Sequence, residues 1–265
     1  MKRKDAIKRI PEGIKAFDTW KPVIINKYKT LIISDIHIRY YSEVALKLAL
    51  EYGYKHNVDA LLINGDLNDF YALSYWQKDP TKRDFGEEIE MTDYILESIR
   101  LAFPGAWIGL KVGNHEERYD KRIIDRLPEM YKVKHFTYAS MINADKYDIE
   151  VISERIPLRI GELNIVHGHE FGRMFASPVN PARGIFNKAK VHCLAGHWHR
   201  TSEHMEKDMN DRVVGCWSTG CLCDLHPDWL PLNNWNHGFA LVELLDDRSG
   251  DFIVYNKKII NGKVL

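Results

Sequence analysis

The sequence predicts an α/β fold built on a mixed sheet, or on two sheets packed face to face, in a chain of 265 residues. Five short apolar runs have the composition of strands that are buried on both faces. Two stretches between them have the spacing of helices, and this alternation favours one α/β domain over two separable domains. Hydrophobic residues make up 45% of the chain and charged residues 28%, which excludes a disordered chain or a disulfide scaffold.

The expected strands, taken in chain order, are residues 30–34, 60–64, 107–112, 163–166 and 191–195. A helix is expected at residues 42–57, because Ser42 is a good capping residue and apolar residues follow it at helical spacing. A second helix is expected at residues 87–103, where it would end before Pro104.

Residues 157–166 depart from this alternation, because Gly161-Glu162 between two apolar runs is typical of a hairpin. Further strands are expected at residues 239–245 and 252–255, joined by turn-rich residues. The segments expected to be loops are residues 70–85, 171–181 and 201–211. We interpret residues 1–28 as an N-terminal arm and residues 29–265 as a single domain.

Charge and hydropathy limit the partners of the protein. Lys and Arg (37) balance Asp and Glu (37), so binding to nucleic acid would need a local basic patch. No apolar stretch approaches the roughly 18 residues of a membrane helix, and none follows the basic start as in a signal peptide. We therefore expect a cytoplasmic protein with reduced cysteines and no membrane partner. Because their spacing is not that of usual zinc sites, we interpret Cys216, Cys221 and Cys223 as buried thiols, with a soft-metal site as the alternative.

Metal-ligand residues stand directly after each of the five apolar runs. Because the carboxyl ends of strands form the ligand-binding rim of an open α/β sheet, these distant segments would deliver their side chains to one place. Each group alone is also compatible with an ordinary turn or cap. Five independent turns have no reason to carry this set in this order, which favours a shared site. The groups are Asp35-x-His37, Gly65-Asp66-x-x-Asp69, Gly113-Asn114-His115-Glu116, His167-Gly168-His169 and Gly196-His197-x-His199.

In order and residue type, this series resembles the five-motif signature of the calcineurin-like metallophosphoesterases. The resemblance covers residues 31–200 and implies an α/β/β/α sandwich of two mixed sheets flanked by helices. It also implies two divalent metal ions that share Asp66 and a metal-bridging hydroxide that hydrolyses a phosphate ester. One ion would be bound by Asp35, His37, Asp66 and His199, and the other by Asp66, Asn114, His167 and His197.

Oxygen and nitrogen donors without a thiolate suit borderline divalent ions. We expect Mn first, with Fe, Zn, Co or Ni as alternatives. Two ions that share a carboxylate lower the pKa of a bridging water and neutralise phosphoryl oxygens, so that hydroxide can attack phosphorus in line with the leaving group. The resemblance makes His115 the candidate to protonate the leaving oxygen. The alternative is that His115 only makes a hydrogen bond that orients Asp35 or Asp66.

Three further residues are candidates for supporting or substrate contacts. Asp69 is expected to orient a ligand. His169 is expected to touch substrate, face water or support His167, and Arg183 to hold a phosphate oxygen. Other basic residues near the motifs are Arg118, Lys121, Arg122, Arg126 and Arg173.

The expected substrate is a phosphate ester, and the motifs do not choose among the members of this class. Aromatic and basic residues interleave in residues 70–85, as in a groove for single-stranded nucleic acid, although the aromatic residues could instead pack on the core. A phosphodiesterase acting on nucleic acid or nucleotides, similar to the repair-nuclease branch of the family, is the leading hypothesis. A phosphomonoesterase of the protein-phosphatase or nucleotidase kind is the alternative, and a non-catalytic scaffold is disfavoured because every ligand position is filled. Nothing in the sequence indicates an oligomeric state. The aromatic and basic residues that interleave within residues 70–85 are Tyr71, Tyr75, Trp76, Lys78, Lys82 and Arg83.

Overall fold

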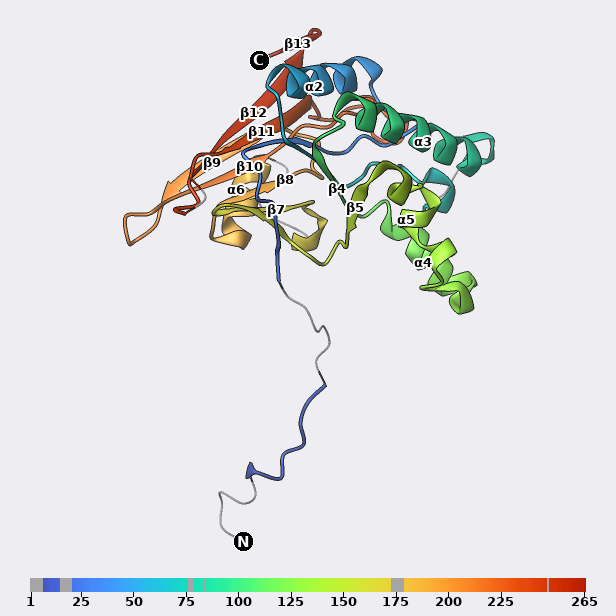
Figure 1. The fold of residues 1–265 in the computed structure, drawn as a ribbon, viewed down its shortest axis with the longest axis horizontal. Helices are drawn as coiled ribbons and strands as arrows, with labels where there is room; N and C mark the ends of the chain where they lie inside the picture. Colours follow the sequence, from blue (N-terminus) through green and yellow to red (C-terminus); the bar gives the residue numbers. More distant parts are fainter. Residues whose placement is uncertain (1–6, 15–20, 76–78, 83, 173–178, 247) are drawn as a thin grey trace.

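Two mixed β-sheets pack face to face and carry helices on their outer faces in the computed structural model of the chain (Figure 1). The structure describes residues 7–14, 21–75, 79–82, 84–172, 179–246 and 248–265. The core between the sheets includes Ile32 and Leu62 from one sheet and Leu158, Leu194 and Trp217 from the other. This layered arrangement confirms the α/β/β/α sandwich that the family resemblance implies.

In the described residues, seven strands form the larger sheet, in the order β13-β12-β11-β2-β3-β4-β5. The four strands from β2 to β5 run parallel, and β11 is antiparallel to both of its neighbours. Parallel strands that are covered on both faces need continuous apolar runs, which is why β2, β3 and β4 were predicted, whereas β5 was not. The bounds are β2 (Lys29–Ile33), β3 (Ala60–Asn64), β4 (Trp107–Lys111), β5 (Ile149–Ile152), β11 (His237–Leu244), β12 (Phe252–Ile260) and β13 (Lys263–Val264).

The smaller sheet has six strands among the described residues, in the order β1-β6-β7-β8-β10-β9. β6 and β7 form the predicted hairpin, with Gly161 in the left-handed region at its turn (φ 53°). The prediction of a loop at residues 201–211 was wrong, because residues 202–207 form an edge strand that is held by backbone pairing with β10 and exposes polar side chains. The bounds are β1 (Val23–Ile24), β6 (Leu158–Ile160), β7 (Leu163–Val166), β8 (Cys193–Ala195), β9 (Ser202–Lys207) and β10 (Val213–Ser218).

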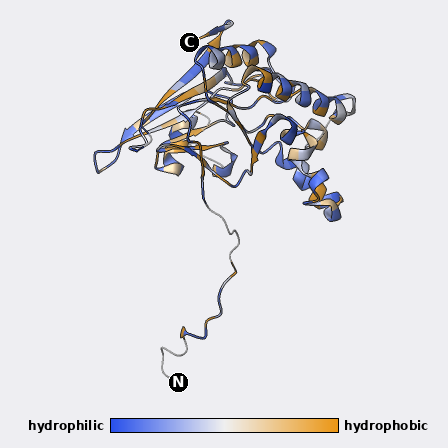
Figure 2. Cartoon of the chain, in the orientation of Figure 1, coloured by the Kyte–Doolittle hydropathy of each residue, from blue (hydrophilic) through white to orange (hydrophobic). Residues whose placement is uncertain are grey.

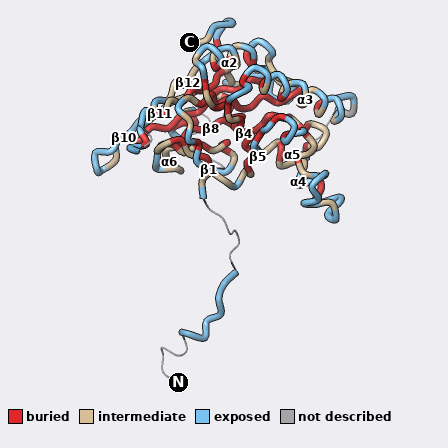
Figure 3. The backbone as a smooth tube through the Cα atoms, viewed as in Figure 1, coloured by how far each residue is buried: buried red, intermediate tan, exposed pale blue. Residues whose placement is uncertain are grey.

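Helices cover the outer faces of both sheets, and both predicted helices are present. Leu46 of α2 and Ile99 of α3 pack on the larger sheet, while Ile185 of α6 packs on the smaller one. Ser42 caps α2 as predicted, and Asp84 caps α3 slightly before its predicted start. Figure 2 shows hydrophobic residues in the sheets, and Figure 3 shows that the outer faces of the helices are exposed. The bounds are α2 (Glu43–Lys55), α3 (Phe85–Ala102), α4 (Glu117–Arg126), α5 (Tyr138–Met141) and α6 (Pro181–Ala189), with short 3-10 turns η1 (Tyr71–Leu73) and η2 (Pro80–Lys82) in the segment expected to be a loop.

The N-terminal segment, residues 1–28, is described in part. Residues 7–14 are exposed and lie apart from the sheets (Figure 3). Strand β1 pairs with β6, so the end of the segment joins the smaller sheet. Among the helices that the structure describes, none has the length and apolar character needed to cross a membrane.

The carboxyl ends of β3 and β7 are joined across the two sheets. Asn64 Nδ2 donates to the Val166 carbonyl (2.8 Å), and His167 Nδ1 donates to the Asn64 carbonyl (2.7 Å). A side chain at Gly65 would lie 2.3 Å from His167 Nδ1, so this close approach requires glycine. The Gly196 N–H, after β8, donates to the His167 carbonyl (2.8 Å). The ends of strands from both sheets therefore meet, as the sequence predicts.

Candidate metal centre

Most of the predicted ligands lie at sharp turns, where the backbone adopts the left-handed conformation. The left-handed φ values are 54° for Asp35, 49° for His37, 52° for Asp66, 68° for His197 and 54° for His199. Asp and His tolerate this conformation better than branched side chains do, although it is uncommon for any residue with a Cβ atom. Backbone strain of this kind concentrates at functional sites, where surrounding contacts hold it in place.

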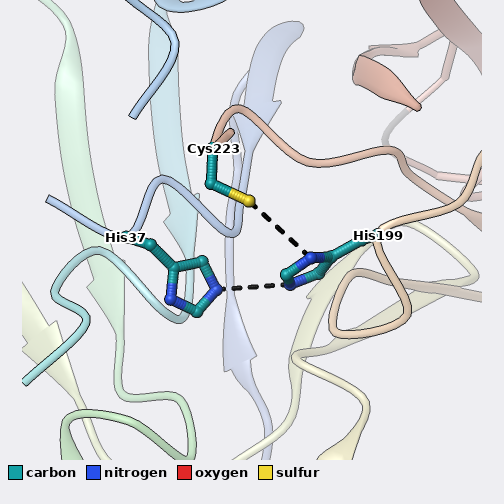
Figure 4. Close-up of side chains that lie close together, drawn as sticks. All are labelled: His37, His199 and Cys223. Atoms are coloured by element: carbon teal, nitrogen blue, oxygen red, sulfur yellow. Dashed lines mark hydrogen bonds between the residues drawn. The ribbon is translucent and has the colours of Figure 1, made fainter. Parts of the chain in front are cut away.

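Asp35, His37 and His199 form the first group of convergent donors. His199 Nε2 lies 3.2 Å from Asp35 Oδ1 and 3.2 Å from His37 Nε2. All three side chains are buried, and the His197 N–H donates to the Asp35 carboxylate (3.0 Å). Figure 4 shows that the His37 and His199 rings point nitrogen atoms at each other. Two imidazole nitrogens at this distance need a shared proton or a cation near both.

Asp66, His167 and His197 form the second group, in which one donor atom from each residue lies within 4.8 Å of the others. His167 Nε2 is 3.2 Å from Asp66 Oδ2. The same Oδ2 atom is 3.8 Å from His37 Nε2 in the first group. Asp66 therefore lies between the two groups, which is the position that a shared ligand requires.

Buried polar atoms without partners mark the same place. Asn114 Oδ1 is buried and makes no hydrogen bond within the described part of the chain, and His167 Nε2, 3.2 Å from Asp66 Oδ2, has the distance of an ion pair without the angles of a hydrogen bond. An unsatisfied buried polar atom costs about 1–3 kcal/mol, so a ligand at these atoms is favoured. Carboxylate, imidazole and amide donors together fit two borderline divalent cations. Such cations, when bound, act as Lewis acids and neutralise charge on phosphoryl oxygens.

Without metal, the carboxylates and imidazoles of the two groups pair as ions. Burial opposes ionisation, but the charge of His199 lowers the pKa of Asp35 to about 2. Burial likewise opposes the charging of His167, but Asp66 raises the pKa of His167 to about 10. Burial lowers the pKa of His197 to about 4, so this imidazole is neutral. Because protons occupy nitrogens that would bind a cation, metal binding must release protons.

Glu116 holds the backbone around the predicted shared ligand. Its Oε2 accepts hydrogen bonds from the N–H groups of Asp66 (3.0 Å) and Gly113 (2.7 Å), and its Oε1 accepts from Asn68 (2.9 Å). Asp66 Oδ1 in turn accepts from the His115 N–H (3.0 Å). These bonds fix the direction of the Asp66 carboxylate relative to the strand ends.

His115 lies beside the same carboxylate, with Nε2 3.9 Å from Asp66 Oδ2. Its Nδ1 donates to the Asp69 carbonyl (2.8 Å), and Arg118 donates to its Nε2 (3.0 Å). Burial lowers the pKa of His115, but the charge of Asp66 and the bond to Asp69 raise it above its ordinary value. Asp69 Oδ1 also lies 3.1 Å from His37 Nδ1, the geometry that the predicted orienting role requires.

Two other candidates lie at different distances from the convergent donors. The His169 ring centroid is 5.3 Å from that of His167, and its Nε2 is 3.3 Å from Glu117 Oε1, so His169 borders the second group. Arg183 is exposed on α6, where its backbone N–H donates to Asn180 Oδ1, and within the described ranges its side chain forms no hydrogen bond or ion pair with the donors. The candidates outside the described residues are Trp76, Lys78, Arg83 and Arg173.

Sequence reasoning missed the contact between Cys223 and a predicted ligand. Cys223 Sγ is 3.7 Å from His199 Nδ1, whereas Nε2 of the same ring faces His37 (Figure 4). A hydrogen bond to Cys221, together with burial, raises the pKa of the Cys223 thiol well above its ordinary value. With its proton on Nδ1, the His199 ring would donate to this sulfur, and Nε2 would be left to bind a cation. Cys223 Sγ also lies within 4.8 Å of donor nitrogens of His37 and His199, so this sulfur either orients His199 or joins the same donors around a cation, which is the soft-metal alternative that the sequence leaves open.

Replacing Cys223 with alanine is expected to weaken Mn²⁺ binding by about 10- to 100-fold, because the His199 ring loses the partner that orients it. Cys223→Ser keeps an acceptor at this position and is expected to retain most of the affinity. Equilibrium dialysis of the metal-stripped proteins against Mn²⁺ measures both effects. An unchanged affinity in Cys223→Ala would show that the sulfur does not orient His199.

A buried carboxylate on α3, Glu88, holds the loop that carries Asp69. Glu88 Oε1 accepts from the N–H groups of Asp69 (2.8 Å) and Phe70 (2.9 Å). Burial raises the pKa of Glu88 to about 7 in spite of these bonds. Sequence reasoning missed this residue, because a glutamate on a helix has no local pattern that distinguishes a buried carboxylate from a solvated one.

Glu88→Gln is expected to raise the Tm of the metal-stripped protein at pH 8 by about 2–4 °C, which corresponds to about 1 kcal/mol in a domain of this size. The pKa of Glu88 is higher in the folded protein than its ordinary 4.5, so its contribution to stability is full below pH 4.5 and is lost as pH rises through about 7. Glutamine keeps the accepting Oε1 and carries no charge. Thermal unfolding from pH 5 to pH 8 checks this, and a difference that grew toward pH 5 would contradict it.

Comparison with known proteins identifies the family to which the chain is similar. The family model of the calcineurin-like phosphoesterases matches residues 28–255. A search of curated proteins finds no significant match. Among solved structures, vacuolar protein sorting 29 from Cryptosporidium parvum is 15% identical, with a TM-score of 0.48 over 90% of this chain and 95% of that chain. YfcE, a phosphoesterase from E. coli, is 13% identical, with a TM-score of 0.35 over 85% of this chain and 96% of that chain. A dimetal phosphatase from Danio rerio is 10% identical, with a TM-score of 0.40 over 92% of this chain and 98% of that chain.

The family match extends over most of the chain and includes both groups of convergent donors, from Asp35 to His199. Its residues also include every strand of the larger sheet that carries a predicted ligand. The chain therefore belongs to the calcineurin-like phosphoesterase family and is a metal-dependent phosphoesterase.

Proposed function

We propose that the protein hydrolyses phosphodiesters of nucleotides or nucleic acid, with two divalent cations, Mn²⁺ first among them. The observation that carries the proposal is the position of Asp66 Oδ2, 3.2 Å from His167 Nε2 in one donor group and 3.8 Å from His37 Nε2 in the other. A carboxylate between two sets of donors suits a pair of cations that act on one phosphate. The proposed ligands are Asp35, His37, Asp66, Asn114, His167, His197 and His199.

Arg118 and His115 supply the groups that would act on the phosphate itself. Arg118 Nη1 donates to the Asp69 carbonyl (2.8 Å), and its Nη2 donates to His115 Nε2 (3.0 Å). A phosphoryl oxygen that enters the site accepts the Nη2–H in place of His115, because a charge-assisted bond is the stronger one. His115 Nε2 is then free to carry a proton to the leaving oxygen.

In the part of the rim that the structure describes, charge favours a diester over a monoester. A diester carries one negative charge at neutral pH, whereas a monoester dianion carries two and needs more cationic partners. Arg39, a second guanidinium next to the first motif, is already paired with Glu87 (2.7 Å). Beside it, the rings of Tyr40 and Tyr71 contact each other, with centroids 6.4 Å apart, and offer uncharged surface to an organic substituent.

The proposal is tested by stripping the protein of metal and adding back Mn²⁺, Zn²⁺, Mg²⁺ or Ni²⁺. We expect kcat/KM for bis(p-nitrophenyl) phosphate to exceed that for p-nitrophenyl phosphate, with Mn²⁺ the most effective ion. The same measurements on Asp66→Asn control for contaminating phosphatases. Preference for the monoester would overturn the proposal in favour of a phosphomonoesterase.

A further inference from the structure

Residues 224–236, which we call the tryptophan loop, lie against the metal centre. The Trp235 ring makes an edge contact with the ring of His199, with centroids 4.1 Å apart and ring planes at 61°. The Trp229 ring makes an edge contact in turn with Trp235, with centroids 5.5 Å apart and ring planes at 64°. Trp235 is half-buried, whereas 69% of the Trp229 surface is exposed. An exposed indole thus extends outward from the ring that covers a proposed metal ligand.

Hydrogen bonds fasten the tryptophan loop before any ligand binds. Asn233 Nδ2 donates to the carbonyls of Leu225 (2.7 Å) and Leu230 (2.9 Å), and its Oδ1 accepts from the Trp235 N–H (2.8 Å). The backbone N–H that follows Trp235 donates to the His199 carbonyl (3.0 Å). Because the loop is already ordered, a ligand that stacks on the indoles would bind with only a small entropic cost for ordering the protein.

The tryptophan loop shares its rim with two other segments at the strand ends. The Asp224 N–H donates to the Tyr40 carbonyl (2.6 Å), in the segment after β2. Asp228 forms an ion pair with Lys82 of η2. The second contact also places a cation beside the carboxylate next to Trp229, which reduces the repulsion between this carboxylate and a phosphate group.

We propose that Trp229 and Trp235 form a stacking platform for the nucleobase of a nucleotide whose phosphate occupies the metal centre. This inference rests on the proposed function, because that function places the phosphate next to His199. The flat faces of indoles stack on any base, which suits a substrate class defined by its backbone. The platform gives a role to the exposed Trp229 ring, because the hydrogen bonds that hold the loop do not involve this side chain.

The test compares AMP with ribose 5-phosphate, which differ by the presence of the base. Calorimetric titrations use the full-length, Mn²⁺-loaded protein and do not depend on turnover. We expect AMP to bind roughly 5- to 150-fold more tightly than ribose 5-phosphate. Trp229→Ala is expected to bring this ratio close to one, whereas Trp229→Phe, which keeps an aromatic face, retains most of it.

Tyr54→Ala is the matched control. Tyr54 is 70% exposed and Trp229 is 69% exposed, so the two side chains are similarly accessible. Tyr54 lies near the end of α2, which leads into the amino end of β3, whereas the metal centre lies at the carboxyl ends of the strands. Its replacement should leave the ratio unchanged. Circular dichroism and Tm confirm that each variant is folded.

Three results would overturn the platform: equal binding of the two ligands, no measurable binding of AMP, or a preference that survives in Trp229→Ala. The outcome is separable from that of the proposed function. If the protein binds AMP more tightly than ribose 5-phosphate through Trp229 but hydrolyses neither nitrophenyl ester, the platform is supported and the phosphodiesterase function is rejected. Rapid diester hydrolysis without a base preference would do the reverse.

Discussion

Asp66→Asn is expected to lower kcat for phosphate ester hydrolysis by at least about 1,000-fold, or roughly 4 kcal/mol in activation free energy. The carboxylate lies between the donor groups, 3.2 Å from His167 Nε2 and 3.8 Å from His37 Nε2. Asparagine has the same shape and keeps an oxygen for the His115 N–H, but it lacks the charge that two cations share. Steady-state kinetics at saturating Mn²⁺ measure the loss.

Asp120→Asn, the same exchange on α4 outside both donor groups, is the matched control and should retain full activity. The Tm of Asp66→Asn in the presence of a chelator shows whether the fold survives, because under that condition no metal contributes to stability. Activity of Asp66→Asn within a few-fold of wild type would contradict a bridging role for this carboxylate.

His115→Asn is expected to slow hydrolysis by about 100- to 10,000-fold when the leaving group is an alkoxide, and much less when it is p-nitrophenolate. An alkoxide needs a proton as it leaves, whereas p-nitrophenolate is stable without one. His115 is placed for this transfer, 3.9 Å from Asp66 Oδ2 and held by Asp69 and Arg118. Parallel assays with a dinucleotide and with bis(p-nitrophenyl) phosphate measure the two losses.

His169→Asn is the control for this series, since His169 borders the second donor group without approaching Asp66 as His115 does. We expect it to change both rates by less than about 10-fold. Equal losses on the two substrates in His115→Asn would show that this residue orients the carboxylate and does not deliver a proton.

The strands that position the donors could be predicted because strands that are buried on both faces appear in the sequence as short apolar runs. Residues 60–64 form β3 with the predicted bounds, β2 is shifted by one residue from prediction, and β4 ends one residue earlier than predicted. Parallel strands place their carboxyl ends together, so the gathering of Asp35, His37 and Asp66 follows from the topology of the larger sheet. His167, His197 and His199 instead follow β7 and β8 of the smaller sheet. What the runs do not encode is the distance between side chains, which depends on how the two sheets are joined at Asn64 and Val166.

Other contacts could not be predicted because they depend on irregular backbone or on burial of polar groups. Cys223 and Trp235 reach His199 through a segment that is positioned by single backbone bonds, such as the Leu222 N–H to the Asp35 carbonyl (3.0 Å), and such bonds leave no periodicity in the sequence. Lys111 is another example: it is fully buried and pairs with Glu170 (3.1 Å), the carboxylate that caps the turn after β7. A lysine within an apolar run gives no sign of which distant carboxylate will meet it.

Anomalous diffraction from a crystal soaked in manganese tests the central claim most directly. Our account predicts two peaks per chain, one beside Asp35, His37 and His199 and one beside Asn114, His167 and His197, with the Asp66 carboxylate between them. A single peak, or peaks that lie away from these side chains, would contradict it.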